Sequence, residues 1–575
     1  MEKRAIYAIL LTFFIIIAWT FIQSKFFPQP PSKPQPQEVK KDQIAPAEKA
    51  AEKKVSEEKR LAKERAPGKP KVVPQKEISI ETQNYWAVFT SDDARLKHFK
   101  LKKYEDRVDE AALTIKLIQF VEEILGKKVE KPKKPEPLDL VNTREEKNLP
   151  LGLTLLLSDE NWEVDKDQLR LLESGEKGEI IFSKSLDNGL KVLKRFRFTS
   201  DLYTINLEVE VQNNSSKEVT NQFGLEWIGE IELAKLAKEE NKDFGLKYSF
   251  LRNQKVEKKE FGGASTSGCV PSCGTQKKTI EPFETTEKGE IKWFSFGGEY
   301  FTLLLIPPPS KEITLSVKGT EKELLKADVI TPPISIPPKE RVNVAYQIYL
   351  GPKDEDRLKA LGVGAEKMVD FGFFTIVAKP LLWFLRLTHT VTKNYGIDII
   401  VLSILIKIIF LPLTQISFKS MKEMQKVQPE MNRLKEQYKN DKARLQQEIM
   451  LLYKRRKINP MSGCLPMLIQ IPVFIALYNA LQNGMEMRHA PFFLWIMDLS
   501  AKDPIYITPL IMGATMVIQQ KMTPTAADPT QAKMFLLMPV MFTFLFLNFP
   551  SGLVLYWLVN NVLSISHQYY LNKKP

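Results

Sequence analysis

One lysine interrupts an apolar stretch that is long enough to span a membrane. The stretch, residues 396–414, reads GIDIIVLSILIKIIFLPLT, and Lys407 lies inside it. Counted from Asp398 at about 1.5 Å per residue, Lys407 is roughly 13 Å along a helix, near the middle of a bilayer core about 30 Å thick. A central lysine costs about 2.5–3.5 kcal/mol to insert, and each Leu, Ile, Val or Phe neighbour returns about 0.3–0.6 kcal/mol. The span can therefore insert, and its charge indicates a functional role.

Ser403 lies one helical turn before Lys407, and the lysine side chain is expected to lean back over it. This face is either packed between helices, with the lysine bonded to carbonyl groups, or part of a wet, positively charged cavity. A Ser–Lys pair also suits an intramembrane peptidase, but a serine inside a regular helix has no free backbone N–H groups for an oxyanion hole. A transporter or channel is the other alternative, although an inverted repeat and mid-span carboxylates are missing.

The other apolar segments contribute further polar and aromatic residues. Amide side chains in hydrocarbon normally seek protein or water partners, so they are candidates to face the interior. Each is also compatible with simple helix packing, and the aromatic candidates with lipid-facing anchoring. Besides Lys407 and Ser403, the predicted cavity is lined by Gln470, Gln520, Tyr556, Trp557 and Asn560; the spans also hold Asn479, Gln519 and Asn561.

Hydropathy and flanking charges predict six transmembrane helices. Residues 1–23 form an N-terminal anchor, in which MEKR precedes an apolar run; a cleaved signal peptide is the alternative, but no A-x-A-like site follows. Because Lys and Arg favour the cytoplasmic side, both termini are expected there. The other spans are expected at about residues 396–415, 463–482, 505–520, 534–549 and 553–568, within a core domain of residues 395–575.

The amino-acid composition differs strongly from one region of the chain to another. The 575 residues carry a net charge of +14, and a mean hydropathy of -0.22 averages over very charged and very apolar regions. Residues 24–76 are rich in Pro, Lys, Glu and Ala, and we expect a disordered linker because they cannot bury a core. Three cysteines exclude a disulfide-dense scaffold, and neither a cofactor nor a metal site is expected.

Residues 77–352 show an alternation of apolar and polar side chains that is typical of half-buried strands. We expect one large antiparallel β-sandwich on the outer side of the membrane, with a helical insertion near residues 111–125. The domain holds a single histidine, His98, which leaves no histidine pair for acid–base chemistry on a sugar. The alternation is clearest at Ile205, Leu207, Val209 and Val211, at Ile313, Leu315 and Val317, and at Val342, Val344, Tyr346, Ile348 and Leu350.

The outer part contains two cysteines that lie close together in the sequence. Cys269 and Cys273 can form a loop disulfide in an oxidising compartment, or stay reduced; two thiols are too few for a structural zinc site.

Residues 353–394 contain an aromatic and aliphatic segment that is interrupted by Lys379, Pro380 and Arg386. These interruptions predict a helix along the outer membrane surface rather than a span.

Residues 416–459 are strongly basic, which places them in the cytoplasm. Their apolar residues recur every three or four positions on both sides of Asn440 and Asp441, so we expect a helical hairpin. The hairpin is either a self-packed pair with solvated charges or, in addition, a docking site for acidic surfaces such as ribosomal RNA or lipid headgroups; no DNA partner is expected. The candidate contacts are Lys419, Lys422, Lys426, Arg433, Arg455 and Arg456.

Three long motifs resemble the YidC-type membrane-protein insertases of bacteria. They are NPMSGCLPMLIQIPVFIALYNAL at residues 459–481, APFFLWIMDLSAKDP at residues 490–504 and FPSGLVLYWLVNN at residues 549–561, supported by PLT at residues 412–414. The motifs are collinear over about residues 395–570. The anchor, the linker and the β-rich outer domain resemble the Gram-negative form of the family.

The resemblance implies a five-helix core around a hydrophilic groove that is open to the cytoplasm and to lipid. The family normally has an arginine in this groove, and Lys407 stands at the matching position, so the charge is kept without the forked hydrogen bonding of arginine. Ser403 matches a family position with a small hydroxyl residue. The implied function is non-enzymatic insertion of nascent membrane proteins into the inner membrane, alone or with the Sec translocon and its accessory subunits. The ribosome, through the basic hairpin, and membrane lipids are the other expected partners.

Overall fold

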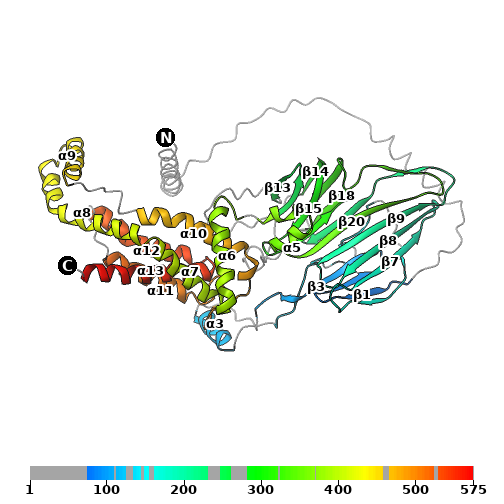
Figure 1. The fold of residues 1–575 in the computed structure, drawn as a ribbon, viewed down its shortest axis with the longest axis horizontal. Helices are drawn as coiled ribbons and strands as arrows, with labels where there is room; N and C mark the ends of the chain where they lie inside the picture. Colours follow the sequence, from blue (N-terminus) through cyan, green and yellow to red (C-terminus); the bar gives the residue numbers. More distant parts are fainter. Residues whose placement is uncertain are drawn as a thin grey trace, which may run out of the picture. The chain divides into compact units, whose positions relative to one another are not determined.

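The computed structural model describes residues 74–573, except for 109–111, 125–133, 144, 146–147, 155–160, 231–246, 261–281, 321–323, 370, 457–464 and 523–528. The predicted anchor, the linker as far as residue 73, and the two cysteines at 269 and 273 lie outside the described residues. Strands dominate up to residue 352, and helices dominate after it (Figure 1).

A nine-stranded sheet forms the largest part of the β-rich domain. Its neighbours pair antiparallel, and β9, β8 and β7 lie side by side in Figure 1. Ile205, Leu207 and Val209 of β9 are buried, whereas Asn206 between them is exposed, so the predicted alternation is confirmed. In order across the sheet, the strands are β13 (Lys255–Glu260), β12 (Lys247–Arg252), β15 (Ile291–Gly297), β16 (Phe301–Ile306), β20 (Arg341–Pro352), β9 (Thr204–Asn213), β8 (Leu190–Thr199), β7 (Lys177–Ser185) and β5 (Glu163–Val164).

In the described part of the domain, three smaller sheets accompany the nine-stranded one, and most buried residues there belong to one continuous apolar core. One pair departs from the predicted antiparallel sandwich: β1 and β6 run parallel, because the long connection between them lets β6 return along the outer edge of β1. The predicted insertion is confirmed as helix α3 (Ala112–Ile124). The sheets are β4 (Pro137–Asp139), β3 (Arg95–Glu105), β2 (Tyr85–Thr90), β1 (Glu77–Glu81) and β6 (Gln168–Arg170); β11 (Gly224–Glu230), β18 (Leu324–Ile330), β17 (Ile313–Gly319) and β14 (Phe283–Gly289); and β10 (Val219–Asn221) with β19 (Ile334–Ile336).

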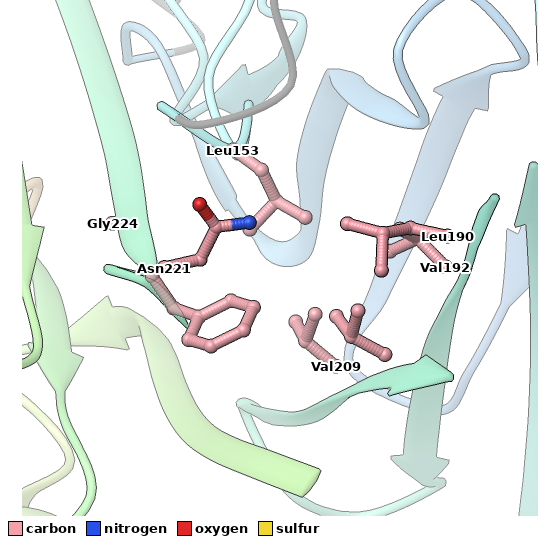
Figure 2. A pocket seen from close by; sticks show the side chains of 8 residues that line it. Leu153, Leu190, Val192, Val209, Asn221 and Gly224 are labelled. Carbon is pink, nitrogen blue, oxygen red and sulfur yellow. The ribbon is translucent and has the colours of Figure 1, made fainter. Parts of the chain in front are cut away.

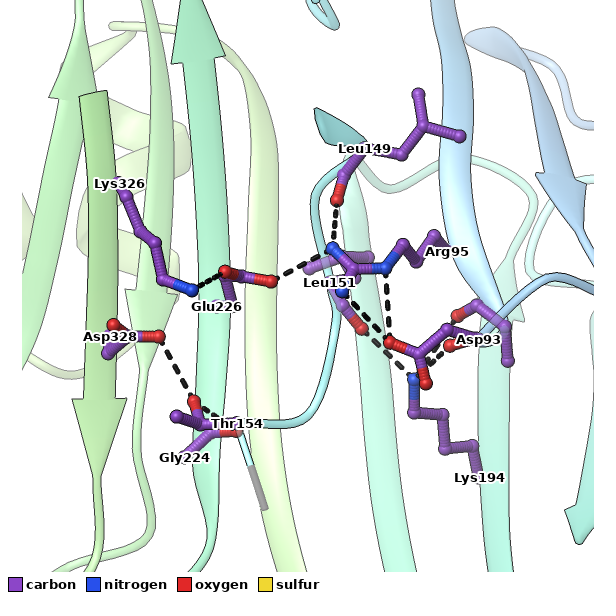
Figure 3. A network of polar contacts seen from close by, with 11 residues as sticks. Asp93, Arg95, Leu149, Leu151, Thr154, Lys194, Gly224, Glu226, Lys326 and Asp328 are labelled. Carbon is purple, nitrogen blue, oxygen red and sulfur yellow. Dashed lines mark hydrogen bonds and ion pairs between the residues drawn. The ribbon is translucent and has the colours of Figure 1, made fainter. Parts of the chain in front are cut away.

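A polar network that contains a buried lysine connects the nine-stranded sheet with two of the smaller sheets (Figure 3). Lys194 of β8 is fully buried, and burial lowers the pKa of its ammonium to about 8. Beside it, Arg95 of β3 donates to Asp93 at 3.0 Å and to Glu226 of β11 at 2.8 Å. The Lys194 ammonium is held by three backbone carbonyl oxygens, those of Asp93 at 2.6 Å, Leu151 at 3.1 Å and Ala94 at 3.4 Å.

Helix α6 (Thr375–Thr392) follows α5 (Glu355–Ala360) and the short 3-10 helix η2 (Ala365–Met368). It carries Pro380 and has a strongly exposed apolar side, on which Ile376 is 87% and Trp383 is 63% exposed. Its opposite side buries Ala378, Leu382 and Leu385. An apolar side that is not packed in the protein suits a lipid surface, and the location of this helix on the outer membrane surface stays a prediction.

The predicted first core span is broken rather than continuous. Helix α7 (Tyr395–Ile409) ends at Phe410, and α8 (Leu411–Gln437) leaves at an angle of 60°. Pro412 contributes to the break, because it has no backbone N–H to donate to the preceding turn. Among the described helices, none alone combines the length and the hydropathy of a membrane span, whereas the bent pair α7 and α8 reaches both together.

Helix α13 packs against several of the other helices. This helix contacts α7, α10 and α11, and α11 contacts α12. Helix α9 packs on α8 through Val427, Met431 and Leu452, which forms the predicted helical hairpin. The bounds are α9 (Lys442–Arg455), α10 (Leu465–Asn483), η4 (Met485–Met487), α11 (Ile507–Met522), α12 (Pro529–Phe546) and α13 (Ser551–Lys573).

Candidate functional site

Lys407 lies two residues before the end of α7 and points to α13. The helix begins at an N-cap, where the side chain of Asn394 accepts hydrogen bonds from the backbone N–H groups of Gly396 at 2.9 Å and Ile397 at 3.2 Å. At the other end, the half-buried ammonium of Lys407 donates to the hydroxyl oxygen of Ser564 at 2.6 Å. The charge is therefore held between two helices that are far apart in the sequence.

A line of polar side chains continues from this contact along α13. The Ser564 hydroxyl donates to the backbone oxygen of Asn560 at 2.7 Å, and the Asn560 amide donates to the backbone oxygen of Tyr556 at 3.0 Å. The Tyr556 hydroxyl accepts a hydrogen bond from Gln470 of α10 at 2.7 Å. The structure thus brings together Lys407, Gln470, Tyr556 and Asn560, four of the predicted site residues.

Sequence reasoning missed Ser564, although a signal for it exists. Tyr556, Asn560 and Ser564 are spaced by four residues, which puts them on one face of a helix. A serine alone in an apolar helix looks like a small packing residue, so only its place in this series identifies it.

Ser403 has a different setting from the one expected. It is fully buried, and its hydroxyl donates to the backbone oxygen of Ile399 at 2.7 Å, one turn earlier in the same helix. Lys407 therefore bonds to Ser564 of α13 rather than to Ser403. The hydrogen bonds of these two residues do not form the Ser–Lys dyad that a peptidase would need.

Trp557 and Gln520 lie outside the polar line. The Trp557 ring packs against Phe474 at 5.2 Å, Phe546 at 5.3 Å and Phe542 at 6.0 Å between ring centres. This aromatic cluster joins α10, α12 and α13 and gives Trp557 a packing role. Gln520 is half-buried near the end of α11.

Negative charge is absent beside Lys407 within the described ranges. No carboxylate there forms an ion pair with Lys407. The one acidic residue of α7, Asp398, is fully buried at the start of the helix, where it accepts from Thr392 at 2.7 Å and lies 3.0 Å from His389 Nδ1. The described part of the chain also contains no group of His, Cys, Asp and Glu that could hold a metal ion.

The basic residues of the hairpin lie on its outer surface. Part of their charge is compensated locally, because Lys426 pairs with Glu423 at 2.8 Å and Arg456 pairs with Glu430. All six predicted contacts, Lys419, Lys422, Lys426, Arg433, Arg455 and Arg456, are exposed.

The β-rich domain has a small pocket of a different kind (Figure 2). Apart from Asn221, which Figure 2 shows among them, its lining consists of apolar side chains and Gly224. The lining therefore offers no general acid or base. His98 lies elsewhere in the domain, with its Nδ1 2.7 Å from Asp139.

Comparison with known proteins covers both parts of the chain. Residues 387–575 match the family model of the 60Kd inner membrane protein, and residues 77–384 match that of the YidC periplasmic domain. The membrane protein insertase YidC of Syntrophus aciditrophicus (strain SB) is 41% identical over 507 residues, which cover 87% of this chain and 85% of that protein. The one from Geobacter sulfurreducens (strain ATCC 51573 / DSM 12127 / PCA) is 43% identical over 399 residues, 69% of this chain and 71% of that protein.

Among solved structures, the crystal structure of an active YidC insertase with its first transmembrane domain resolved matches 87% of this chain and 93% of its own, at 19% identity and a TM-score of 0.35. The family assignment rests on the two family models and on the curated relatives. The chain belongs to the YidC family of membrane protein insertases.

Proposed function

We propose that this chain inserts nascent membrane proteins into the bacterial inner membrane. The observation that carries the proposal is Lys407: an ammonium at the end of an apolar helix, bonded to Ser564 of a second helix, with no carboxylate partner among the described residues. An unneutralised charge at such a place needs an anionic or water-filled environment. We propose that a hydrophilic groove open to the cytoplasm and lipid supplies this environment.

In this mechanism the groove lowers the cost of moving a polar outer segment of the client across the membrane. Lys407 attracts acidic groups halfway, and water in the groove keeps the peptide groups of the client solvated. Gln470, Tyr556 and Asn560 continue the polar line on the side of α13 that Lys407 contacts. The apolar segment of the client then leaves sideways into lipid, and no covalent step is involved.

Short helices support the same mechanism. Helix α7 has 15 residues, about 22 Å along its axis, whereas the hydrocarbon core of a bilayer is about 30 Å thick. A membrane that adapts to such helices becomes thinner around them, which shortens the apolar path of the client.

The other parts of the chain would set the membrane topology and contact the partners of the insertase. We propose six spans with both termini in the cytoplasm and the β-rich domain in the periplasm, with α6 on the outer membrane surface. The exposed basic side of the α8–α9 hairpin would receive the nascent chain or the ribosome and contact lipid headgroups. The β-rich domain and α6 would serve contacts with the Sec translocon and its accessory subunits.

Insertion of a small single-span client into proteoliposomes tests the proposal. The protein variants are wild type, Lys407→Ala and Lys407→Arg, with Lys367→Ala as a control because Lys367 is an exposed lysine of η2. We expect Lys407→Arg to retain insertion and Lys407→Ala to lower it roughly tenfold, the equivalent of about 1.4 kcal/mol. If the alanine variant matches wild type, the charge is dispensable. If wild type inserts nothing, independent insertase action is refuted.

A further inference from the structure

Helix α3 stands apart from the apolar core of the β-rich domain. Its side chains Leu117, Ile118 and Phe120 belong to none of the apolar clusters that the described residues form. Phe120 is 61% exposed, whereas Leu101 of the preceding strand β3 is fully buried. An amphipathic helix whose apolar residues are not part of a core needs another apolar surface.

The start of α3 lies against the loop that joins α10 to α11. Arg488 of this loop donates to the backbone oxygen of Glu105, at the end of β3, at 2.7 Å. Further along both segments, the hydroxyl of Thr114 in α3 donates to the backbone oxygen of Leu494 at 3.3 Å. Two contacts therefore hold the chain between β3 and α3 beside residues 488–494.

This loop has an exposed apolar tip at the second contact. Phe493 is 55% exposed, and Leu494 is 67% exposed. The tip is an ordered turn, because the backbone N–H of Phe492 donates to the oxygen of Ile496 at 2.9 Å. Leu494 has a φ of +56°, a left-handed conformation that is uncommon for a leucine. A strained turn that presents two large apolar side chains indicates an interaction surface.

The place of the tip indicates that this surface meets lipid. The side-chain amide of Asn394 donates to the backbone oxygen of Phe492 at 3.3 Å, and the Phe492 ring lies against Gly396 in the first turn of α7. Helix α7 exposes apolar side chains such as Val401 and Ile404, which suit the hydrocarbon that surrounds a membrane protein insertase. The tip therefore lies at the end of an apolar helix and continues its exposed surface.

We propose that α3 and the tip formed by Phe493 and Leu494 bind the lipid surface, so that the β-rich domain rests on the outer leaflet. Phe120 enters the boundary between headgroups and acyl chains, at the depth of about 5–10 Å that is usual for amphipathic surface helices. Lys116 is exposed one turn earlier on the same side, from where its ammonium reaches the headgroups. The inference goes beyond the proposed function and uses its placement of the β-rich domain on the outer side.

A fluorescent probe tests the lipid contact in the full chain. The three native cysteines are replaced by serine, and single cysteines are introduced by Phe120→Cys, Leu494→Cys or Leu172→Cys. Leu172 is the matched control, because it is a 54% exposed apolar residue after β6 of the same domain. Each cysteine carries a probe whose emission shifts to the blue in an apolar environment. The proteins are reconstituted in phosphatidylethanolamine and phosphatidylglycerol, with or without a lipid that bears a nitroxide quencher on the upper part of its acyl chain.

We expect the nitroxide to quench the probes at positions 120 and 494 at least about twofold more than the probe at 172, because a depth of about 5–10 Å brings them to the quencher. Quenching at 494 alone overturns the role of α3. Blue-shifted emission without quenching, lost when the protein is diluted in lipid, identifies a second copy of the chain as the occupant and overturns the lipid contact.

Insertion of the single-span client is measured in the same vesicles. Vesicles that insert the client while the probe at 120 stays unquenched overturn this inference and leave the proposed function intact. Vesicles in which the probes at 120 and 494 are quenched but the client is not inserted support the lipid contact and refute independent insertase action. The two failures are therefore distinguishable.

Discussion

Lys194 allows a quantitative test of the buried network in the β-rich domain. In the folded state its pKa is about 8, below the ordinary value of 10.5, because burial penalises the charged ammonium. Between these two values the unfolded chain binds more protons than the folded chain, so stability rises with pH in this window. From about pH 7 to about pH 9.5, the expected gain in the free energy of unfolding is about 2 kcal/mol, out of a maximum of about 3 kcal/mol.

The assay is urea unfolding of the whole protein in detergent, followed by the fluorescence of buried tryptophans such as Trp162 and Trp293. With a slope of about 3 kcal/mol per molar urea, a gain of about 2 kcal/mol moves the midpoint of the β-rich domain by roughly 0.7 M. Lys194→Met is the matched variant, because it keeps the length of the side chain and removes the titrating group. Subtracting its pH dependence from that of wild type also removes the contribution of all other titrating groups.

Subtracting the two pH dependences isolates the titration of Lys194. The loss of hydrogen bonds to the three carbonyl groups changes the stability of Lys194→Met at every pH by a similar amount, so it cancels in the comparison across pH. If the midpoints of wild type and Lys194→Met shift in parallel between about pH 7 and about pH 9.5, Lys194 titrates normally and the reasoning is refuted.

Three further predictions concern the helical part. Ser564→Ala should lower proteoliposome insertion about fivefold, less than Lys407→Ala, because one hydrogen bond to a charged group is lost; Ser564→Thr should restore it, and equal activity of all three would contradict this role. Gly396→Ala should lower the melting temperature in detergent, because the new Cβ would lie 2.0 Å from Phe492, and adding Phe492→Ala should relieve the clash. Leu452→Ala should destabilise the hairpin by about 2–3 kcal/mol, seen as faster hydrogen exchange in α9 but not in α13.

The strands were predictable because one side of a sheet packs on the core. In β9 and β17 the apolar residues recur at every second position, and their burial follows that period. The parallel pairing of β6 with β1 was not predictable, because β6 has only three residues, Gln168–Arg170, and its partner is set by the path of a long connection. A local pattern carries no information about such a path.

The candidate site was predictable in its residue types and not in its contacts. A lysine, amides and a tyrosine in apolar helices are conspicuous, and Lys407, Gln470, Tyr556 and Asn560 do lie along one polar line. Which hydroxyl Lys407 reaches depends on the relative height and rotation of α7 and α13. Sequence spacing within one helix cannot give this register, so it favoured Ser403 in place of Ser564.

In the proposed mechanism, the pattern of hydrogen bonds would let Lys407 exchange partners at low cost. The hydroxyl of Ser564 donates its proton to the backbone oxygen of Asn560 and only accepts from Lys407. When the ammonium turns to an acidic group of a client, Ser564 keeps its donor bond, and the Asn560 amide keeps its own bond to Tyr556. Release therefore breaks one hydrogen bond and leaves the side-chain donors of Ser564 and Asn560 satisfied. An ion pair in place of Ser564 would instead have to be broken for every client, which leaves two charges exposed to a poorly solvated environment. A neutral acceptor with its own backbone bond thus holds the charge in position without competing strongly for it.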